Sequence, residues 1–335
     1  MPAVPALPSA VPGAAWRPLS QDDVEPYVAL LEAARVADGG EEVMTAEVAR
    51  RELADPHCPP ATNTLALALD DGTLGGVAAV YERFSGEEAR RAFLFGTVRP
   101  DLRDRGVGRG LVAWAVARAD EALAGQPESL ERLVEVFLDE RLTPAIHLFE
   151  RMGFERVRWY MDMRRDLHEP IPELALPPGI RLETCRTELS EALRAVHNEA
   201  FADHWGSMPL TEDVWTLDFL GDPRFRSDLT FIAFDGEEIA GQSLNYVAED
   251  DWAATGIREG WIGQLSVRRP WRKQGLATAL LVRSMQAFLD AGLDGAALGV
   301  DAENPSGAVG IYERLGFRPT HRSVRLQRPF SCSAG

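Results

Sequence analysis

The chain has 335 residues and a mass of 36.8 kDa, which predicts two domains of ordinary size or one large domain. Hydrophobic residues make up 45% and charged residues 26%, which is typical of globular proteins and excludes collagen, coiled coil and wholesale disorder. The net charge of −17 argues against a broad nucleic-acid-binding surface, because such a surface needs positive charge.

The N-terminal segment has no positively charged stretch and is interrupted by prolines, so it is not a signal peptide. A run of about 18 apolar residues is absent, which excludes a membrane-spanning helix. Cys58, Cys185 and Cys332 are far apart and match no metal-ligand spacing, so we expect reduced thiols and no metal. We therefore expect a cytoplasmic protein without nucleic-acid or membrane partners, and the oligomeric state stays open.

The first half contains strand-like runs at 64–69, 74–81 and 92–98, with Asp70, Asp71 and Gly72 as a hairpin turn between the first two. An amphipathic helical pattern follows at 111–123. Residues 167–177 are rich in proline, cannot form a regular helix or a central strand, and are predicted to be a linker.

The second half contains strands, helices and a hairpin in a similar order. The predicted strands are 180–183, 229–234, 239–247, 259–267, 296–301 and a terminal strand, and the predicted helices are 189–201, 211–220, 275–291 and 306–315. The pattern predicts an α+β fold with a mixed, mostly antiparallel sheet and helices on both faces.

Two elements occur in both halves, which indicates a tandem duplication. The first is an arginine, a glycine three residues later and a second small residue two further on, between a strand and a helix: Arg103, Gly106 and Gly108 in one half, Arg272, Gly275 and Ala277 in the other. The second is the segment from Phe149 to Phe154, which corresponds to Tyr312 to Phe317. We therefore predict two domains, 14–166 and 178–330.

A strand, a glycine-containing loop and a helix are typical of phosphate-binding sites. Small residues let the backbone approach the ligand, and free N–H groups at the helix start favour negative charge. Arginines can add charge-assisted contacts. The alternatives are an ordinary helix start with glycines for packing, or a dinucleotide-binding loop, but the Gly-x-Gly-x-x-Gly spacing of the latter is absent.

The second copy resembles the GCN5-related N-acetyltransferase (GNAT) family. The resemblance rests on Arg272-x-x-Gly275-x-Ala277 and on the downstream segment from Asn304 through Tyr312 to Phe317. It extends over almost the whole chain as two copies. The tandem layout and the segment 198–202 are similar to the mycothiol synthases of actinobacteria.

The resemblance implies acetyl-CoA as co-substrate. The pyrophosphate would bind the loop, the pantetheine would lie along the strand near Leu265 and Val267, and Asn304 would contact the cofactor or cap a helix. The Leu265 N–H would stabilise the oxyanion. The loop residues expected to contact the cofactor are Arg272, Lys273, Gln274, Gly275, Leu276 and Ala277.

The resemblance also implies catalytic roles. Tyr312 stands where the family has a tyrosine that protonates the departing thiolate, although packing is its alternative role. Mycothiol synthase has a glutamate base where this chain has Trp261, so Glu259, on the same strand face, is the substitute candidate. In the first copy Phe149 replaces the tyrosine and Arg141 lies near the position of Asn304.

The first copy keeps Val98, Arg103, Gly106 and Gly108, so it is expected either to bind a CoA thioester without this proton donor or to keep its loop for folding. The acceptor is expected to be a small-molecule amine near His204, Trp205 and Trp261. Two other functions stay open at this point: a non-catalytic acyl-CoA sensor and a protein N-acetyltransferase.

Overall fold

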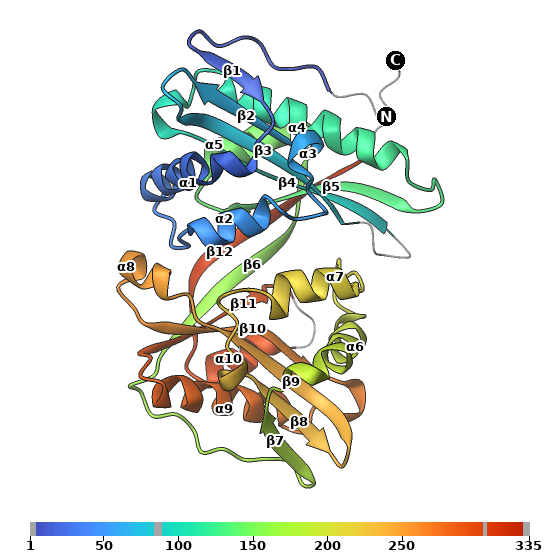
Figure 1. The fold of residues 1–335 in the computed structure, drawn as a ribbon. Helices are drawn as coiled ribbons and strands as arrows, with labels where there is room; N and C mark the ends of the chain where they lie inside the picture. The colour runs from blue at the N-terminus through green and yellow to red at the C-terminus, as the bar shows by residue number, and fades with distance from the viewer. Residues whose placement is uncertain (1–4, 84–88, 304–306, 331–335) are drawn as a thin grey trace. The chain divides into compact units, whose positions relative to one another are not determined.

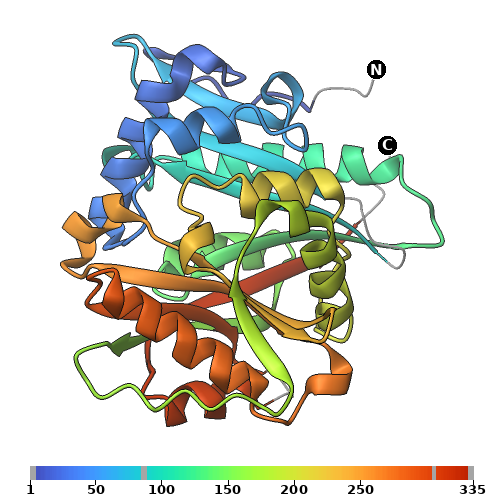
Figure 2. The same cartoon turned by 60° about the horizontal axis from the view of Figure 1, so that its bottom comes forward.

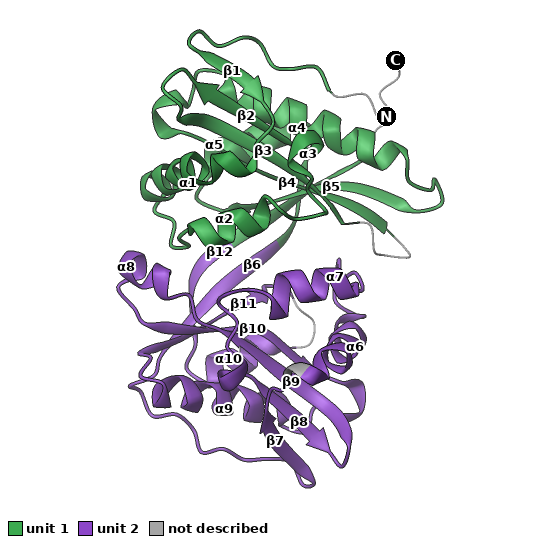
Figure 3. Cartoon of the chain, viewed as in Figure 1, with its two compact units in different colours: residues 1–158, 323–335 green, residues 159–322 purple. Residues whose placement is uncertain are grey.

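The computed structural model describes residues 5–83, 89–303 and 307–330 (Figure 1). The chain forms two compact units, each with a sheet and helices (Figure 3). Unit 1 comprises residues 1–158 and 323–335, and unit 2 comprises residues 159–322. The mostly antiparallel sheets and their helices confirm the predicted α+β class.

The sheet of unit 1 has the strand order β1-β2-β3-β4-β5-β12. Strands β4 and β5 run parallel, and the other neighbours run antiparallel. The predicted turn between β2 and β3 is confirmed, with Gly72 at φ +84°. The strands are β1 (Ala14–Arg17), β2 (Thr64–Leu69), β3 (Leu74–Arg83), β4 (Ala89–Val98), β5 (Glu131–Asp139) and β12 (Arg318–Pro329), and the helices are α1 (Val24–Asp38), α2 (Ala46–Glu52), α3 (Pro60–Asn63), α4 (Val107–Ala124) and α5 (Thr143–Arg151).

The sheet of unit 2 has the order β6-β11-β10-β9-β8-β7, and β10 and β11 run parallel. Helix α9 lies along this sheet (Figures 1 and 2). The strands are β6 (Glu155–Asp166), β7 (Ile180–Thr184), β8 (Phe231–Asp235), β9 (Glu238–Tyr246), β10 (Glu259–Val267) and β11 (Gly295–Asp301), and the helices are α6 (Ser190–Phe201), α7 (Glu212–Trp215), α8 (Trp252–Thr255), α9 (Leu276–Asp290) and α10 (Ala308–Arg314).

Most of the last strand of each sequence half, β6 from residue 159 and β12 from residue 323, lies in the unit of the other half. Residues 160–166 of β6 pair with β11, and residues 323–329 of β12 pair with β5. The compact units therefore differ from a division into 14–166, a linker at 167–177, and 178–330. The physical reason is that hydrogen bonding to a distant strand, not proximity in the chain, assigns a terminal strand to its sheet.

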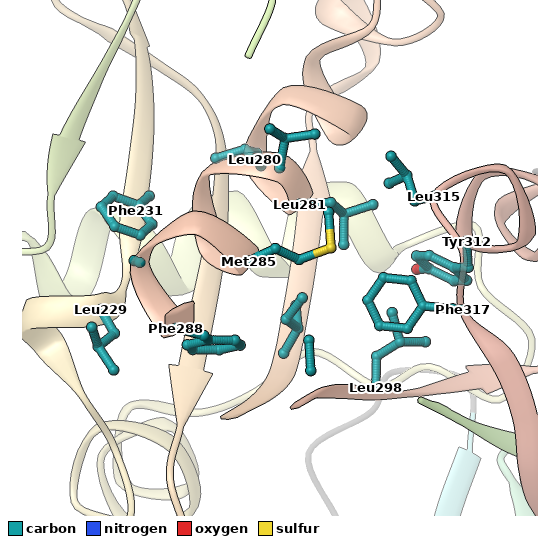
Figure 4. Close-up of a cluster of buried hydrophobic side chains, with 14 of the residues drawn as sticks. Leu229, Phe231, Leu280, Leu281, Met285, Phe288, Leu298, Tyr312, Leu315 and Phe317 are labelled. Atoms are coloured by element: carbon teal, nitrogen blue, oxygen red, sulfur yellow. The ribbon is translucent and has the colours of Figure 1, made fainter. Parts of the chain in front are cut away.

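The core of unit 2 forms where α9 packs on the sheet. Leu281, Met285 and Phe288 recur at helical spacing and meet Leu298 and Phe317 in one buried cluster (Figure 4). Burying such a side chain contributes roughly 1.5–3 kcal/mol. This core holds α9, and with it the loop that precedes α9, against β10.

A buried ion cluster joins the end of β12 to the sheet of unit 1. Glu135 of β5 is fully buried, and Arg91 Nε lies 3.3 Å from its Oε1. From β12, Arg325 donates to Glu135 Oε2, and Gln327 Nε2 donates to Oε1 at 3.2 Å. The Arg325 guanidinium also lies 5.1 Å from the centroid of the Phe137 ring. These contacts fix the C-terminal strand in unit 1.

The free thiols of Cys58 and Cys185 are buried, in agreement with the predicted reduced cysteines, and Cys332 lies outside the described residues. Burial raises the pKa of Cys58 to about 12 and that of Cys185 to about 11, which leaves both unreactive at neutral pH. No described helix combines the length and the apolar character needed to cross a membrane.

Candidate functional site

Strands β10 and β11 of unit 2 separate near their middle. Parallel pairing runs from Glu259 opposite Gly295 to Ile262 opposite Leu298, whereas β10 continues to Val267. In the described part of the chain, no strand pairs with this edge of β10 beyond Ile262. The strands thus open a wedge beside Leu265 and Val267, where the resemblance predicted the pantetheine chain.

A bulge in β10 shifts the register with β9 between Ile262 and Gln264. The shift changes which side chains lie on each face of the strand. Leu265 and Val267 pack against the core on the α9 face. The bulge therefore changes the direction of the side chains of β10 at the point where its pairing with β11 ends, while the opposite edge of β10 stays paired to β9.

The loop before α9 has the backbone geometry of an anion site. Lys273 has φ +60° and Gly275 has φ +87°, and α9 begins at Leu276. The first N–H within the helix ladder is that of Ala279, which donates to Gly275 O, so the preceding N–H groups lie outside the ladder. Alternating backbone conformations direct such groups at one point.

The other loop residues have separate roles. A Cβ at Gly275 would meet no atom within 4 Å, so the surface there is open to a ligand. Gln274 Nε2 donates to Pro270 O at 2.8 Å within the loop. Leu276 is buried and anchors the helix start, while Ala277 is half-buried in its first turn.

Arg272 is directed at the protein itself. Its Nε donates to Val267 O at 3.0 Å, and its Nη2 donates to Ala200 O at 2.8 Å. Its Nη1 lies 3.6 Å from the Asp203 carboxylate. These contacts hold the guanidinium against the protein, and the expected contact of Arg272 with the cofactor stays a prediction.

The loop of unit 1 repeats this arrangement. Asp104 has φ +61° and Gly106 has φ +88°. Arg103 Nε donates to Val98 O at 3.2 Å, and its Nη atoms bind the Asp38 carboxylate at 2.6 and 2.8 Å. The sequence interpretation missed Asp38, whose position at the end of α1 was the one available signal.

A groove of about 760 Å³ lies beside the loop of unit 1. Parallel pairing of β4 and β5 ends at Leu94 opposite Val136, which opens the wedge there. The structure brings the predicted residues together at this groove, whose lining includes Val98, Arg103, Gly106, Gly108 and Phe149. The groove is thus shaped by the same separated strands and the same loop as in unit 2.

Tyr312 and Phe149 occupy matching places in their units. Tyr312 lies on α10 with its ring edge-on to Phe317 at 6.2 Å, and Phe149 lies on α5 edge-on to Phe154 at 5.2 Å. Tyr312 belongs to the buried cluster that contains Leu298, where the wedge begins (Figure 4). Burial raises the pKa of Tyr312 to about 12, so its phenol stays protonated at neutral pH.

Asn304 lies outside the described residues. The strand ends before it nevertheless match: Arg141 N donates to Asp139 Oδ1 at 2.8 Å, and Glu303 N donates to Asp301 Oδ1 at 2.9 Å. This turn aligns Arg141 with Glu303, one residue before Asn304, so Tyr312 follows Asp301 by 11 positions where Phe149 follows Asp139 by 10.

Glu259 is bound by an arginine at the closed end of the wedge. Arg164 Nε donates to its Oε2 at 2.8 Å, and Arg164 Nη2 donates to its Oε1 at 2.9 Å. The pair is largely buried. A bidentate guanidinium–carboxylate pair of this kind fixes the orientation of the carboxylate through two parallel charge-assisted hydrogen bonds. Glu259 thus carries an ion pair three residues before Ile262, the last residue of β10 that pairs with β11, and its role as the base stays a prediction.

Two of the predicted acceptor residues, His204 and Trp205, lie in the loop after α6, whereas the third, Trp261, lies on β10. His204 follows α6 and packs edge-on against Phe201 at 4.5 Å. Burial lowers the pKa of His204, and the positive charge of the nearby Arg272, in the loop before α9, lowers it further. Trp205 is exposed in the same loop. Trp261 lies on β10, directly before the wedge opens.

Family comparisons agree with this geometry. Residues 190–317 match the acetyltransferase (GNAT) family, and residues 61–156 match an acetyltransferase (GNAT) domain. A mycothiol acetyltransferase of Geodermatophilus obscurus is 33% identical, with 88% of this chain and 90% of the relative covered. Its counterpart in Salinispora arenicola is 30% identical, with 92% and 94% covered.

Solved structures give the same result. A GCN5-related N-acetyltransferase from Sphaerobacter thermophilus is 27% identical with a TM-score of 0.74, covering 98% of both chains. A tandem GNAT protein from the clavulanic acid biosynthesis pathway shares the fold, with a TM-score of 0.67, 16% identity, and 96% and 99% covered.

Each half of the chain thus combines two separating parallel strands with a glycine-containing loop before a helix, and the two halves together define a tandem acetyltransferase. This chain belongs to the GNAT acetyltransferase family, and it is an N-acetyltransferase.

Proposed function

We propose that unit 2 transfers the acetyl group of acetyl-CoA directly to the amine of a small molecule, with both substrates bound together. The observation that carries this proposal is the difference between Tyr312 and Phe149 on otherwise matching frames. The relatives named mycothiol acetyltransferases support a small-molecule acceptor.

The reaction makes definite demands on unit 2. The amine lone pair attacks the thioester carbonyl carbon, the C–S bond breaks, the nitrogen loses a proton and the thiolate gains one. The loop before α9 binds the pyrophosphate through its N–H groups, and the open edge of β10 guides the pantetheine into the wedge. A strand N–H, that of Leu265 in our assignment, stabilises the oxyanion.

Tyr312 supplies the proton to the departing sulfur. Its neutral phenol lies in the buried cluster that also contains Leu298, the residue at which the wedge begins. General acids typically contribute a factor of about 10² to 10⁴ to the rate. Phe149 has no proton to give, so unit 1 does not use this route.

Unit 1 retains the means to bind a CoA thioester. The groove of about 760 Å³ beside its loop supports this second proposal. Its role is then cofactor binding without tyrosine-assisted transfer.

The test combines calorimetry with an acetylation assay. The full chain is titrated with acetyl-CoA and then assayed with a panel of small amines for free CoA and acetylated product. We expect Tyr312→Phe to lower kcat by about 10² or more with unchanged acetyl-CoA affinity. Tyr27→Phe removes another buried phenol, bonded to Glu52 in unit 1, and is expected to keep full activity. A Tyr312→Phe rate within threefold of the wild type contradicts the assignment.

A further inference from the structure

Gly299 forms a bare patch of sheet surface where the wedge opens. It follows Leu298, the last residue of β11 that pairs with β10, and it is exposed although its neighbours Leu298 and Val300 are buried. A glycine leaves room there for a ligand group, because it places no side chain over the strand.

A carboxylate and an indole border this patch. A Cβ added at Gly299 would lie 3.6 Å from Asp162 Oδ1 and 3.7 Å from Trp261 Cζ2. Asp162 is the partner of Gly299 on the antiparallel strand β6, and Trp261 comes from β10 on the other side. The three residues thus form one small niche.

The niche lies on the face opposite Tyr312. Met163, Ile262 and Leu298 are buried in the core cluster that also contains Tyr312. Side chains alternate along strands, so Asp162, next to Met163, and Trp261, next to Ile262, lie on the other face. An acceptor in the niche would therefore approach the wedge from the side opposite the proton donor.

A carboxylate beside an indole suits a cation. The carboxylate attracts an ammonium group, and an aromatic ring next to it adds a cation–π attraction. We propose that Asp162 and Trp261 bind the ammonium group of the acceptor over Gly299, which makes Asp162 a specificity residue for primary amines. This inference rests on the proposed acetyl transfer in unit 2.

Unit 1 holds the opposite groups at the matching positions. Its wedge begins at Val136, so Phe137 corresponds to Gly299, and its strand partner Arg325 corresponds to Asp162. A phenylalanine thus fills the patch, and a buried cation with its guanidinium 5.1 Å from that ring replaces the carboxylate. Unit 1 thus lacks both the tyrosine and the niche. This is the pattern expected if the tyrosine and the niche of unit 2 serve one reaction.

Calorimetry on the CoA-saturated full chain tests the niche. Glucosamine, cysteamine and spermidine are the probes, with glucose and 2-mercaptoethanol as uncharged counterparts of the first two. We expect at least one amine to bind and at least tenfold weaker binding by Asp162→Asn and by Gly299→Val. Asp166→Asn is the control, because Asp166 lies on the same strand at the far end of its pairing with β11. It should change the affinity less than twofold.

Two results would overturn the inference: amine binding by Asp162→Asn within twofold of the wild type, or no probe bound by the wild type in preference to its counterpart. Loss of acetyl-CoA binding in Asp162→Asn would assign a structural role and overturn it as well. Acetylation assays with the same amines separate the two proposals. Binding that depends on Asp162 without acetyl transfer contradicts the proposed function alone, whereas transfer unaffected by Asp162→Asn contradicts the niche alone.

Discussion

Replacement of Glu135 by glutamine should destabilise unit 1 locally. Glu135 has 0% of its surface exposed, and the two guanidinium groups that face it belong to Arg91 and Arg325, which are 9% and 4% exposed. The amide keeps the size of the side chain but removes the charge that both cations face. Breaking a buried ion pair by removing one partner costs about 3–5 kcal/mol.

Hydrogen exchange measures this cost, because the two units can open separately. A loss of about 3–5 kcal/mol should speed amide exchange in β5 and in residues 323–329 by roughly 10² to nearly 10⁴, with β10 and β11 of unit 2 unchanged. Glu150→Gln is the control, because its 2.8 Å pair with Arg156 is more than a third exposed on both sides and should contribute at most about 1 kcal/mol. Acceleration below tenfold in β5 would refute the reasoning.

Three further predictions concern unit 2 and its counterpart. Burial lowers the pKa of His197 to about 4, so the folded state loses stability as the pH falls from about 6.5, the pKa in the unfolded chain, to about 4. Urea unfolding at pH 7 and at pH 5 should show that His197→Phe reduces this loss of stability by about 2 kcal/mol, and an unchanged loss would contradict the prediction. Gly275→Val and Gly106→Val force a side chain into positive φ, and each should abolish one acetyl-CoA site in calorimetry; two sites remaining in either variant would contradict the loop assignment. Arg272→Met removes both hydrogen bonds of the guanidinium and should weaken acetyl-CoA binding at least about tenfold. An unchanged Kd would show that the loop keeps its conformation without Arg272.

Local patterns in the sequence were sufficient for the parts of the fold that local physics determines. The turn at Gly72, the helix start at Gly275 and the wedge strand ending at Val267 depend on backbone preferences and periodicity over a few residues. The repetition of the loop and of the Tyr312 segment allowed the duplication to be recognised. These features were predicted because the residues that cause them are neighbours in the chain.

The partners of distant strands could not be predicted in this way. Pairing of β6 with β11 brings Arg164 to Glu259 and forms an ion pair that no local pattern predicts. The same pairing brings Asp162 beside Gly299, although the two residues are 137 positions apart in the chain, which is farther than any local pattern extends. The hydrogen bonds of Arg272 could not be predicted either, because their acceptors are the backbone carbonyl groups of Val267 and Ala200, which any residue could supply.

The exchange of terminal strands has a consequence for biosynthesis. The ribosome completes residues up to 158 early, yet the sheet of unit 1 lacks its last strand until residues 323–329 have been translated. Until then β5 presents an open edge, and Glu135 is without Arg325. Unit 2 has its borrowed strand β6 from the beginning of its own synthesis. The half that is made first is therefore finished last, and a nascent chain that stalls late in translation would release an incomplete first unit.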